Sequence, residues 1–230
     1  GCEDVRGDDW MIDGISSGLQ KGMSGPPGMS PVSLSERAVA RIRNRRHIER
    51  GVRPADYRAG DGPRIQSNYF DLAMLMDYWG PKRLNHHTEA ASMLYAAREA
   101  VRIALDEGDA LFTRHRRASD AIGAGLTAMG LKLFGDQAHK MPNVTGVVIP
   151  NGVDADGVRT MMLDDFGIEI GTSFGPLHGK IWRIGTMGYV CRKENVLLCL
   201  GALEACLRRF GYKAPAGAGV DAALAVYQRG

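Results

Sequence analysis

Lys21 is the residue of this chain whose type and setting most clearly favour chemistry. It follows the run GISSGLQ at 14–20 and precedes the glycine- and proline-rich run GMSGPPG at 22–28. Imine formation needs an amine that can lose its proton near neutral pH, and the pKa of lysine falls readily on desolvation or beside another cation. Rigid backbone around Lys21 therefore makes it a candidate imine-forming amine, whereas an isolated lysine near a strand end is more commonly a solvated charge.

Arg183 is a second candidate, because it stands between apolar neighbours in the run IWRI at 181–184. A charge in a buried strand requires a partner, and a planar guanidinium pairs with a carboxylate through two parallel hydrogen bonds. The residues alone leave two interpretations open, a structural ion pair and a site for the carboxylate of a ligand.

The run LNHHTE at 84–89 carries polar groups just before an expected helix. Thr88 suits the N-cap of that helix, and a helix N-terminus with a hydroxyl is also suited to binding phosphate. His86 and His87 are adjacent on an extended segment, so we expect them to point to opposite faces. With no third ligand evident, no metal site is predicted.

The elements that must position these residues alternate between helix and strand. Periodicity and turn residues predict strands at 10–20, 131–134, 144–149, 168–170 and 181–184, and helices at 33–47, 88–107, 109–128, 154–166, 193–210 and 220–228. Residues 48–68 are expected to form a loop, and 214–219 a flexible linker. This order predicts an α/β fold, divided near residue 107 into domains 1–107 and 108–230.

Composition limits the classes of function. With 230 residues, 44% apolar residues and a net charge of +3, the chain is typical of a globular protein and does not favour nucleic acid as its main partner. No apolar run reaches the roughly 18 residues of a membrane span, so we expect a cytoplasmic protein with no membrane partner. The four cysteines form no C-x-x-C pair and are interpreted as core thiols.

An arginine-rich segment at 41–53 allows an alternative of another class. It is most simply a solvated helix end, but a non-catalytic α/β module that binds RNA or another anion is also compatible with it.

Four stretches, taken in order, resemble one family. They are SSGLQKGMSGPPGMSPVSLSERA at 16–38, LNHHTE at 84–89, MLYAARE at 93–99 and KIWRIGTMG at 180–188. Together they resemble the class V (small-aminotransferase) group of pyridoxal-phosphate enzymes, which contains alanine–glyoxylate and serine–glyoxylate aminotransferases. The resemblance implies a fold-type I pyridoxal 5'-phosphate (PLP)-dependent transferase, with part of the large domain at 1–107, a small C-terminal α/β domain at 108–230, and a homodimer with its active site at the interface.

The same resemblance implies that this chain is a fragment without the N-terminal half of the family. In the family that half supplies the phosphate loop, the aromatic ring stacked on the cofactor and the aspartate beside its pyridine nitrogen, so none of these is assigned here. An inactive fragment with weak cofactor affinity and little or no turnover therefore stays open as an alternative.

The resemblance also implies roles for individual residues. Lys21 would bind PLP covalently and then transfer the proton of the substrate, and Gln20 would lie against the cofactor unless it is only a turn residue. Thr88 would contact the cofactor phosphate across the dimer interface. Arg183 would bind the α-carboxylate of amino-acid and keto-acid substrates.

Asn85 departs from the alanine–glyoxylate pattern, which has a tyrosine before His-His-Thr. An amide offers a donor and an acceptor, which suits a ureido group better than a methyl or hydroxymethyl group. The chain therefore most resembles the branch that moves an amino group from (S)-ureidoglycine to glyoxylate in purine (allantoin) breakdown. Alanine or serine as donor, and a neutral change at Asn85, stay open; a cysteine desulfurase is disfavoured, because no cysteine lies in a recognisable mobile catalytic loop.

Overall fold

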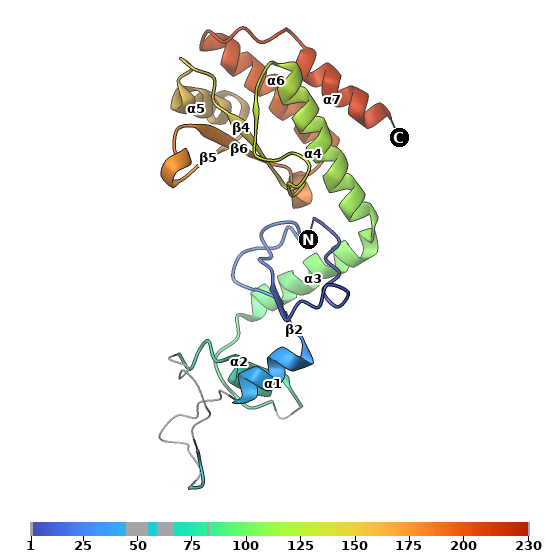
Figure 1. Cartoon of the computed structure of the whole chain (residues 1–230), viewed down its shortest axis with the longest axis vertical. Helices are drawn as coiled ribbons and strands as arrows, with labels where there is room; N and C mark the ends of the chain where they lie inside the picture. Colours follow the sequence, from blue (N-terminus) through green and yellow to red (C-terminus); the bar gives the residue numbers. More distant parts are fainter. Residues whose placement is uncertain (1, 45–54, 59–66, 82, 230) are drawn as a thin grey trace. The chain divides into compact units, whose positions relative to one another are not determined.

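A computed structural model describes residues 2–44, 55–58, 67–81 and 83–229 of the chain (Figure 1). It divides into two compact units. The carboxyl-terminal unit comprises Gly1–Asp4, Leu19–Pro26 and Ala97–Gly230, and the amino-terminal unit comprises Val5–Gly18 and Pro27–Ala96. The expected domain boundary near residue 107 stays a prediction.

The carboxyl-terminal unit is built on a four-stranded antiparallel sheet. Its strands are β3 (Leu133–Phe134), β4 (Val144–Val148), β5 (Gly171–Thr172) and β6 (Ile181–Gly185), in the order β3-β4-β6-β5. Its helices are α4 (Ala110–Ala128), α5 (Ala155–Phe166), α6 (Lys193–Arg209) and α7 (Ala218–Gln228). Helices α4, α6 and α7 pack against one another, as Figure 1 shows. The mixed α/β architecture expected for this region is confirmed.

The core of this unit explains why its elements form. Trp182 and Ile184 alternate with the exposed Arg183 along β6, which is the period-two pattern of a strand with one buried face. Trp182 is completely buried, and its indole N–H donates to the carbonyl of Ala155 at 3.3 Å. The helices contribute buried leucines such as Leu203. One continuous apolar core therefore anchors β6, the strand that carries Arg183.

Helix α5 begins and ends where the sequence predicts. The Asp154 side chain accepts a hydrogen bond from the Gly157 N–H at 3.0 Å, and Gly167 ends the helix in the left-handed region at φ 66°. These are the two ordinary capping devices, a carboxylate at the N-cap and a glycine after the last turn.

The amino-terminal unit contains a small antiparallel pair, β1 (Gly14–Ser16) with β2 (Val32–Leu34), and the helices α1 (Glu36–Asn44) and α2 (Leu72–Trp79). Helix α3 (Ala91–Glu107) begins in this unit and continues into the other. Ser35 caps α1, because its hydroxyl accepts the Ala38 N–H at 3.1 Å. Asp71 likewise caps α2, a helix that the sequence analysis did not predict.

Three expectations are wrong in detail. Residues 168–170 form no strand; the strand next to β6 is Gly171–Thr172. Residues 214–219 are no flexible linker, since Ala214 is 8% exposed and the Gly217 N–H donates to both carboxylate oxygens of Glu204. Helix α3 begins at Ala91 rather than Thr88.

Part of the arginine-rich segment, 45–53, lies outside the described residues, as does most of the expected loop at 48–68. Among the described helices, none is both long and apolar enough to cross a lipid bilayer.

Candidate active site

Lys21 lies in the carboxyl-terminal unit, in a short loop that we call the Lys21 loop (residues 19–25). Leu19 is completely buried, whereas Lys21 is exposed. The loop closes on itself: the Ser24 N–H donates to the Lys21 carbonyl at 3.0 Å and the Gly25 N–H donates to the Leu19 carbonyl at 2.9 Å. Within the described part of the chain, the Lys21 ammonium has no hydrogen-bond or ion-pair partner. The backbone is therefore fixed while the amine is free to react.

The Lys21 loop packs against the turn that follows β6, which we call the glycine turn (residues 186–191). Gly188 has φ +62°, and a Cβ atom there would lie 2.9 Å from the Lys21 carbonyl and would overlap Ser24. The Tyr189 N–H donates to the Ser24 hydroxyl oxygen. Ser24 and Gly188 were missed in the sequence analysis, although the glycine in the KIWRIGTMG run is a signal for such close backbone contact.

Arg183 projects from β6, the strand that leads directly into the glycine turn. Its cross-strand neighbours are glycines on both sides, Gly146 on β4 and Gly171 on β5. No side chain from either flanking strand therefore crowds the guanidinium. Its Nε donates to the Thr172 carbonyl at 2.7 Å, and the guanidinium lies 5.2 Å from the centroid of the Phe174 ring.

Arg183 forms no ion pair with a carboxylate among the described residues, and it is exposed. The structural ion pair considered from the sequence is thus not found in this part of the chain. One hydrogen bond fixes the direction of the side chain and leaves the terminal nitrogens available to a ligand carboxylate.

Gln20 is exposed in the Lys21 loop, directly before Lys21. Asn85 and Thr88 are exposed residues of the amino-terminal unit, on the irregular segment before α3. Thr88 lies three residues before the first helical residue, so it is not the N-cap, and the capping role expected for it is wrong. The structure thus brings Lys21, Gln20 and Arg183 into one compact unit, and Asn85 and Thr88 into the other.

The two adjacent histidines do not point to opposite faces as expected. Their Nδ1 atoms lie 2.9 Å apart, and the rings meet edge to face. His86 Nε2 lies 2.7 Å from the Asn68 carbonyl, and His87 Nε2 lies 3.1 Å from the Glu89 carboxylate. Their positions are thus explained by contacts within the unit. Among the described residues, no group of three or more potential ligands could hold a metal ion.

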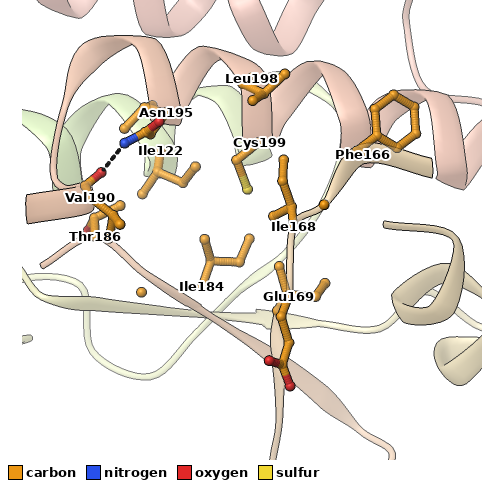
Figure 2. A pocket seen from close by; sticks show the side chains of 14 residues that line it. Ile122, Phe166, Ile168, Glu169, Ile184, Thr186, Val190, Asn195, Leu198 and Cys199 are labelled. Carbon is orange, nitrogen blue, oxygen red and sulfur yellow. Dashed lines mark hydrogen bonds between the residues drawn. The ribbon is translucent and has the colours of Figure 1, made fainter. Parts of the chain in front are cut away.

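A separate pocket of about 330 Å³ lies between the end of α5, the end of β6 and α6 (Figure 2). In Figure 2 Ile184 extends from β6 toward Cys199 on α6, between Asn195 and Phe166. None of the five predicted site residues lines it. Burial raises the pKa of Cys199 to about 12, so this thiol stays protonated and unreactive near neutral pH.

The expectation of core thiols is confirmed. All four cysteines are free and buried, and burial also raises the pKa of Cys191 to about 11. Buried, protonated thiols of this kind are poor nucleophiles near neutral pH.

Among the described residues, neither the amine of Lys21, on a fixed loop, nor the guanidinium of Arg183, on the strand that leads into the glycine turn, has an ion-pair partner, so each is available to a ligand. The fold itself matches a known class of enzyme. The structure superposes on the crystal structure of ureidoglycine–glyoxylate aminotransferase from Bacillus subtilis with a TM-score of 0.87 and 52% identity, covering 98% of this chain and 55% of that chain. The fold is therefore that of the fold-type I PLP-dependent aminotransferases.

The sequence comparisons agree with the structure. The chain is 55% identical over 231 residues to (S)-ureidoglycine–glyoxylate transaminase of Bacillus subtilis (strain 168), which covers 99% of this chain and 55% of the relative. It is 32% identical over 202 residues to alanine–glyoxylate aminotransferase of Drosophila melanogaster, covering 86% of this chain and 47% of the relative. No family model matches.

In sequence and fold, the chain is similar to the ureidoglycine–glyoxylate and alanine–glyoxylate aminotransferases. It spans about half the length of the curated relatives that it matches.

Proposed function

We propose that the protein carrying this chain is a PLP-dependent transaminase that moves the amino group of (S)-ureidoglycine to glyoxylate, giving oxalurate and glycine. The observation that carries the reaction type is the partner-free amine of Lys21 on a backbone held by its neighbours. The choice of donor is supported by the difference between 55% identity to a ureidoglycine–glyoxylate transaminase and 32% identity to an alanine–glyoxylate aminotransferase.

The residues present fit PLP. An aldehyde requires an amine that no carboxylate has already engaged, and Lys21 meets that requirement within the described residues. Lys21 and Gln20 would hold the cofactor, and the Thr88 hydroxyl would be available to the phosphate of the partner's cofactor. When bound, PLP supplies an electron sink for the negative charge that develops at the α-carbon of the substrate.

Lys21 has two tasks in this proposal. Its amine would bind the cofactor covalently and, once free, would take up the α-proton of the amino donor. In the second half-reaction the same nitrogen would deliver a proton to the α-carbon of the new amino acid. One amine can do both because the fixed loop backbone keeps its point of attachment in place while the four-carbon side chain moves.

Arg183 orients both substrates. Ureidoglycine and glyoxylate each carry a carboxylate next to the reacting carbon, so one guanidinium can serve both half-reactions. Two parallel hydrogen bonds to that carboxylate would fix the plane of the substrate and thereby the direction of its α-proton.

Asn85 is proposed to recognise the ureido group, since its amide matches both the N–H donors and the carbonyl acceptor of that group. A homodimer with Thr88 at the phosphate of the partner's cofactor, and a cytoplasmic location, stay predictions. Size measurement of the purified protein and cell fractionation test them.

The decisive experiment is a donor comparison. The protein, supplied with PLP and glyoxylate, is assayed by mass spectrometry for glycine formed from ureidoglycine, alanine or serine. We expect ureidoglycine to be preferred at least tenfold in kcat/KM. Preference for alanine or serine would reject the proposed donor, and no turnover with any donor, despite covalent cofactor at Lys21, would reject the proposed activity.

The variant Asn85→Tyr sharpens the assay. It introduces the tyrosine of the alanine–glyoxylate pattern, so we expect the ratio of ureidoglycine to alanine turnover to fall by about tenfold, as for the loss of one or two hydrogen bonds. An unchanged ratio would remove Asn85 from donor recognition.

A further inference from the structure

His115 is a completely buried histidine in the middle of α4. Its Nδ1 lies 2.7 Å from the Leu111 carbonyl, and its Nε2 lies 2.9 Å from the Gly188 amide nitrogen. A carbonyl only accepts and an amide N–H only donates. Nδ1 must therefore carry the proton and Nε2 must be the acceptor, so only the neutral Nδ1–H form satisfies both neighbours.

Burial favours this neutral form. It lowers the pKa of His115, and the adjacent Arg114 lowers it further, while the hydrogen bond to the Leu111 carbonyl and the charge of Glu107 oppose the shift. The imidazole is thus set to hold the Gly188 N–H with a ring nitrogen that has no proton of its own.

Arg114 holds the same turn from its other side. Its Nη1 donates to the carbonyls of Gly188 at 2.9 Å and Cys191 at 2.8 Å. Its Nη2 donates to the Glu107 carboxylate at 2.8 Å, which orients the guanidinium. The backbone of Gly188 is therefore bound at its N–H by His115 and at its carbonyl by Arg114.

The glycine turn has two chemical neighbours. It continues directly from β6, which carries Arg183, and it touches the Lys21 loop through Ser24 and the Lys21 carbonyl. A shift of the Gly188 peptide would consequently move the supports of both groups.

We propose that His115 is a positioning residue: through the Gly188 peptide it fixes the glycine turn, and through the turn it fixes the Lys21 loop and hence the presentation of the Lys21 amine. This inference deepens the proposed function and rests on it. It is tested by a measurement that needs no cofactor and by one that does.

The first measurement is amide hydrogen exchange at residues 19–25 and 186–191 in the wild type, His115→Leu and His115→Gln. Leucine cannot accept the Gly188 N–H, so we expect exchange to accelerate about tenfold in both segments, as for the loss of one hydrogen bond. Glutamine is neutral and has an acceptor and a donor, so it should restore much of the protection. Thr113→Ala, two residues away on α4, is the matched control, because that hydroxyl bonds only to the backbone of its own helix.

Faster exchange at 186–191 without any change at 19–25 in His115→Leu would overturn the inference. Ser24→Ala provides a second variant in case His115→Leu does not fold. It removes the acceptor of the Tyr189 N–H from the exposed side of the contact, and we expect the same acceleration at 19–25. Unchanged exchange there would equally overturn the inference.

The second measurement is the rate at which PLP followed by borohydride labels Lys21, read by peptide mass spectrometry. We expect the rate in His115→Leu to fall several-fold and to recover in His115→Gln. An equal rate in the wild type and His115→Leu would overturn the positioning role. No labelling of Lys21 even in the wild type would instead reject the proposed function, while the exchange data would still decide whether His115 holds the loop.

Discussion

Two lysines of the carboxyl-terminal unit place their amines in opposite environments. Lys21 is exposed on a loop whose backbone is tied down, and its ammonium has no partner among the described residues. Lys140 is partly buried, and its ammonium donates to the hydroxyls of Ser119 and Thr145, both of them buried. Burial lowers the pKa of Lys140, and nearby Arg116 adds to the shift against the opposing charge of Asp120.

The comparison teaches that a lowered pKa alone does not identify a reactive amine. Lys140 has the perturbed pKa, but two hydroxyls and the surrounding side chains restrict its access to a carbonyl compound. Lys21 has the access and the stable support. In this unit, we therefore infer reactivity from freedom of the amine and rigidity of the backbone together.

The largest effect on turnover should come from removing the Lys21 amine, with the corresponding change at Lys140 as the comparison. Lys21→Ala removes both covalent attachment of the cofactor and the proton carrier, so we expect turnover to fall by about 10³-fold or more. Lys140→Met should leave turnover within a few-fold of the wild type. Steady-state kinetics measures both, and a larger loss in Lys140→Met than in Lys21→Ala would reverse the comparison.

The sequence was sufficient to predict much of the carboxyl-terminal unit, because its signals are local. Asp154 and Gly167 mark the ends of α5, and the alternation around Trp182 marks β6. Helix capping and the alternation of buried and exposed residues depend on residues that are close in sequence, so both can be recognised from the sequence. The α/β class followed from their order.

The features that the sequence did not predict depend on contacts between distant residues. The Ser24 contact with Tyr189 joins positions 165 residues apart, and His115 meets Gly188 across 73 residues. Likewise, the Gly217 N–H donates to Glu204, 13 residues away, and this contact orders a segment that the sequence indicated was a linker. The prediction that His86 and His87 point to opposite faces was wrong because successive side chains alternate between faces only in a regular strand.

Arg183 allows the comparison to be extended to two arginines. Arg159 also donates through Nε to a carbonyl, that of Ile170 at 3.0 Å, but its Nη1 is paired with Asp156. We expect Arg183→Gln to lower kcat/KM by about 100-fold, mainly through KM, because a charge-assisted pair of hydrogen bonds to the substrate carboxylate is lost. Arg159→Gln should change kcat/KM little. Equal losses in the two variants would assign Arg183 a structural role.

Gly188 tests how tightly the support of Lys21 is packed. Gly188→Ala places a methyl group against Ser24 and the Lys21 carbonyl at φ +62°, whereas Gly152→Ala places one in open space at φ +80°. Both pay the left-handed backbone cost of about 1 kcal/mol, but only the first adds overpacking of about 1–3 kcal/mol. Denaturant unfolding should therefore show a larger loss of stability for Gly188→Ala. Equal losses would mean that the glycine turn can move away from the Lys21 loop.

The smallest expected effect is on the free energy of unfolding, which should depend on pH because folding lowers the pKa of Lys140. Between that lowered pKa and the ordinary lysine value of about 10.4, the unfolded chain binds more protons than the folded chain. The free energy of unfolding of the wild type should accordingly rise with pH in this window, relative to Lys140→Met, by at most about 1.4 kcal/mol per pH unit. The variant retains every other lysine, so the difference between the two unfolding curves, measured from pH 8 to 10.5, isolates this one amine. A constant difference would mean that folding leaves the pKa of Lys140 unchanged, and the contrast between the two amines would then rest on their exposure and hydrogen bonds alone.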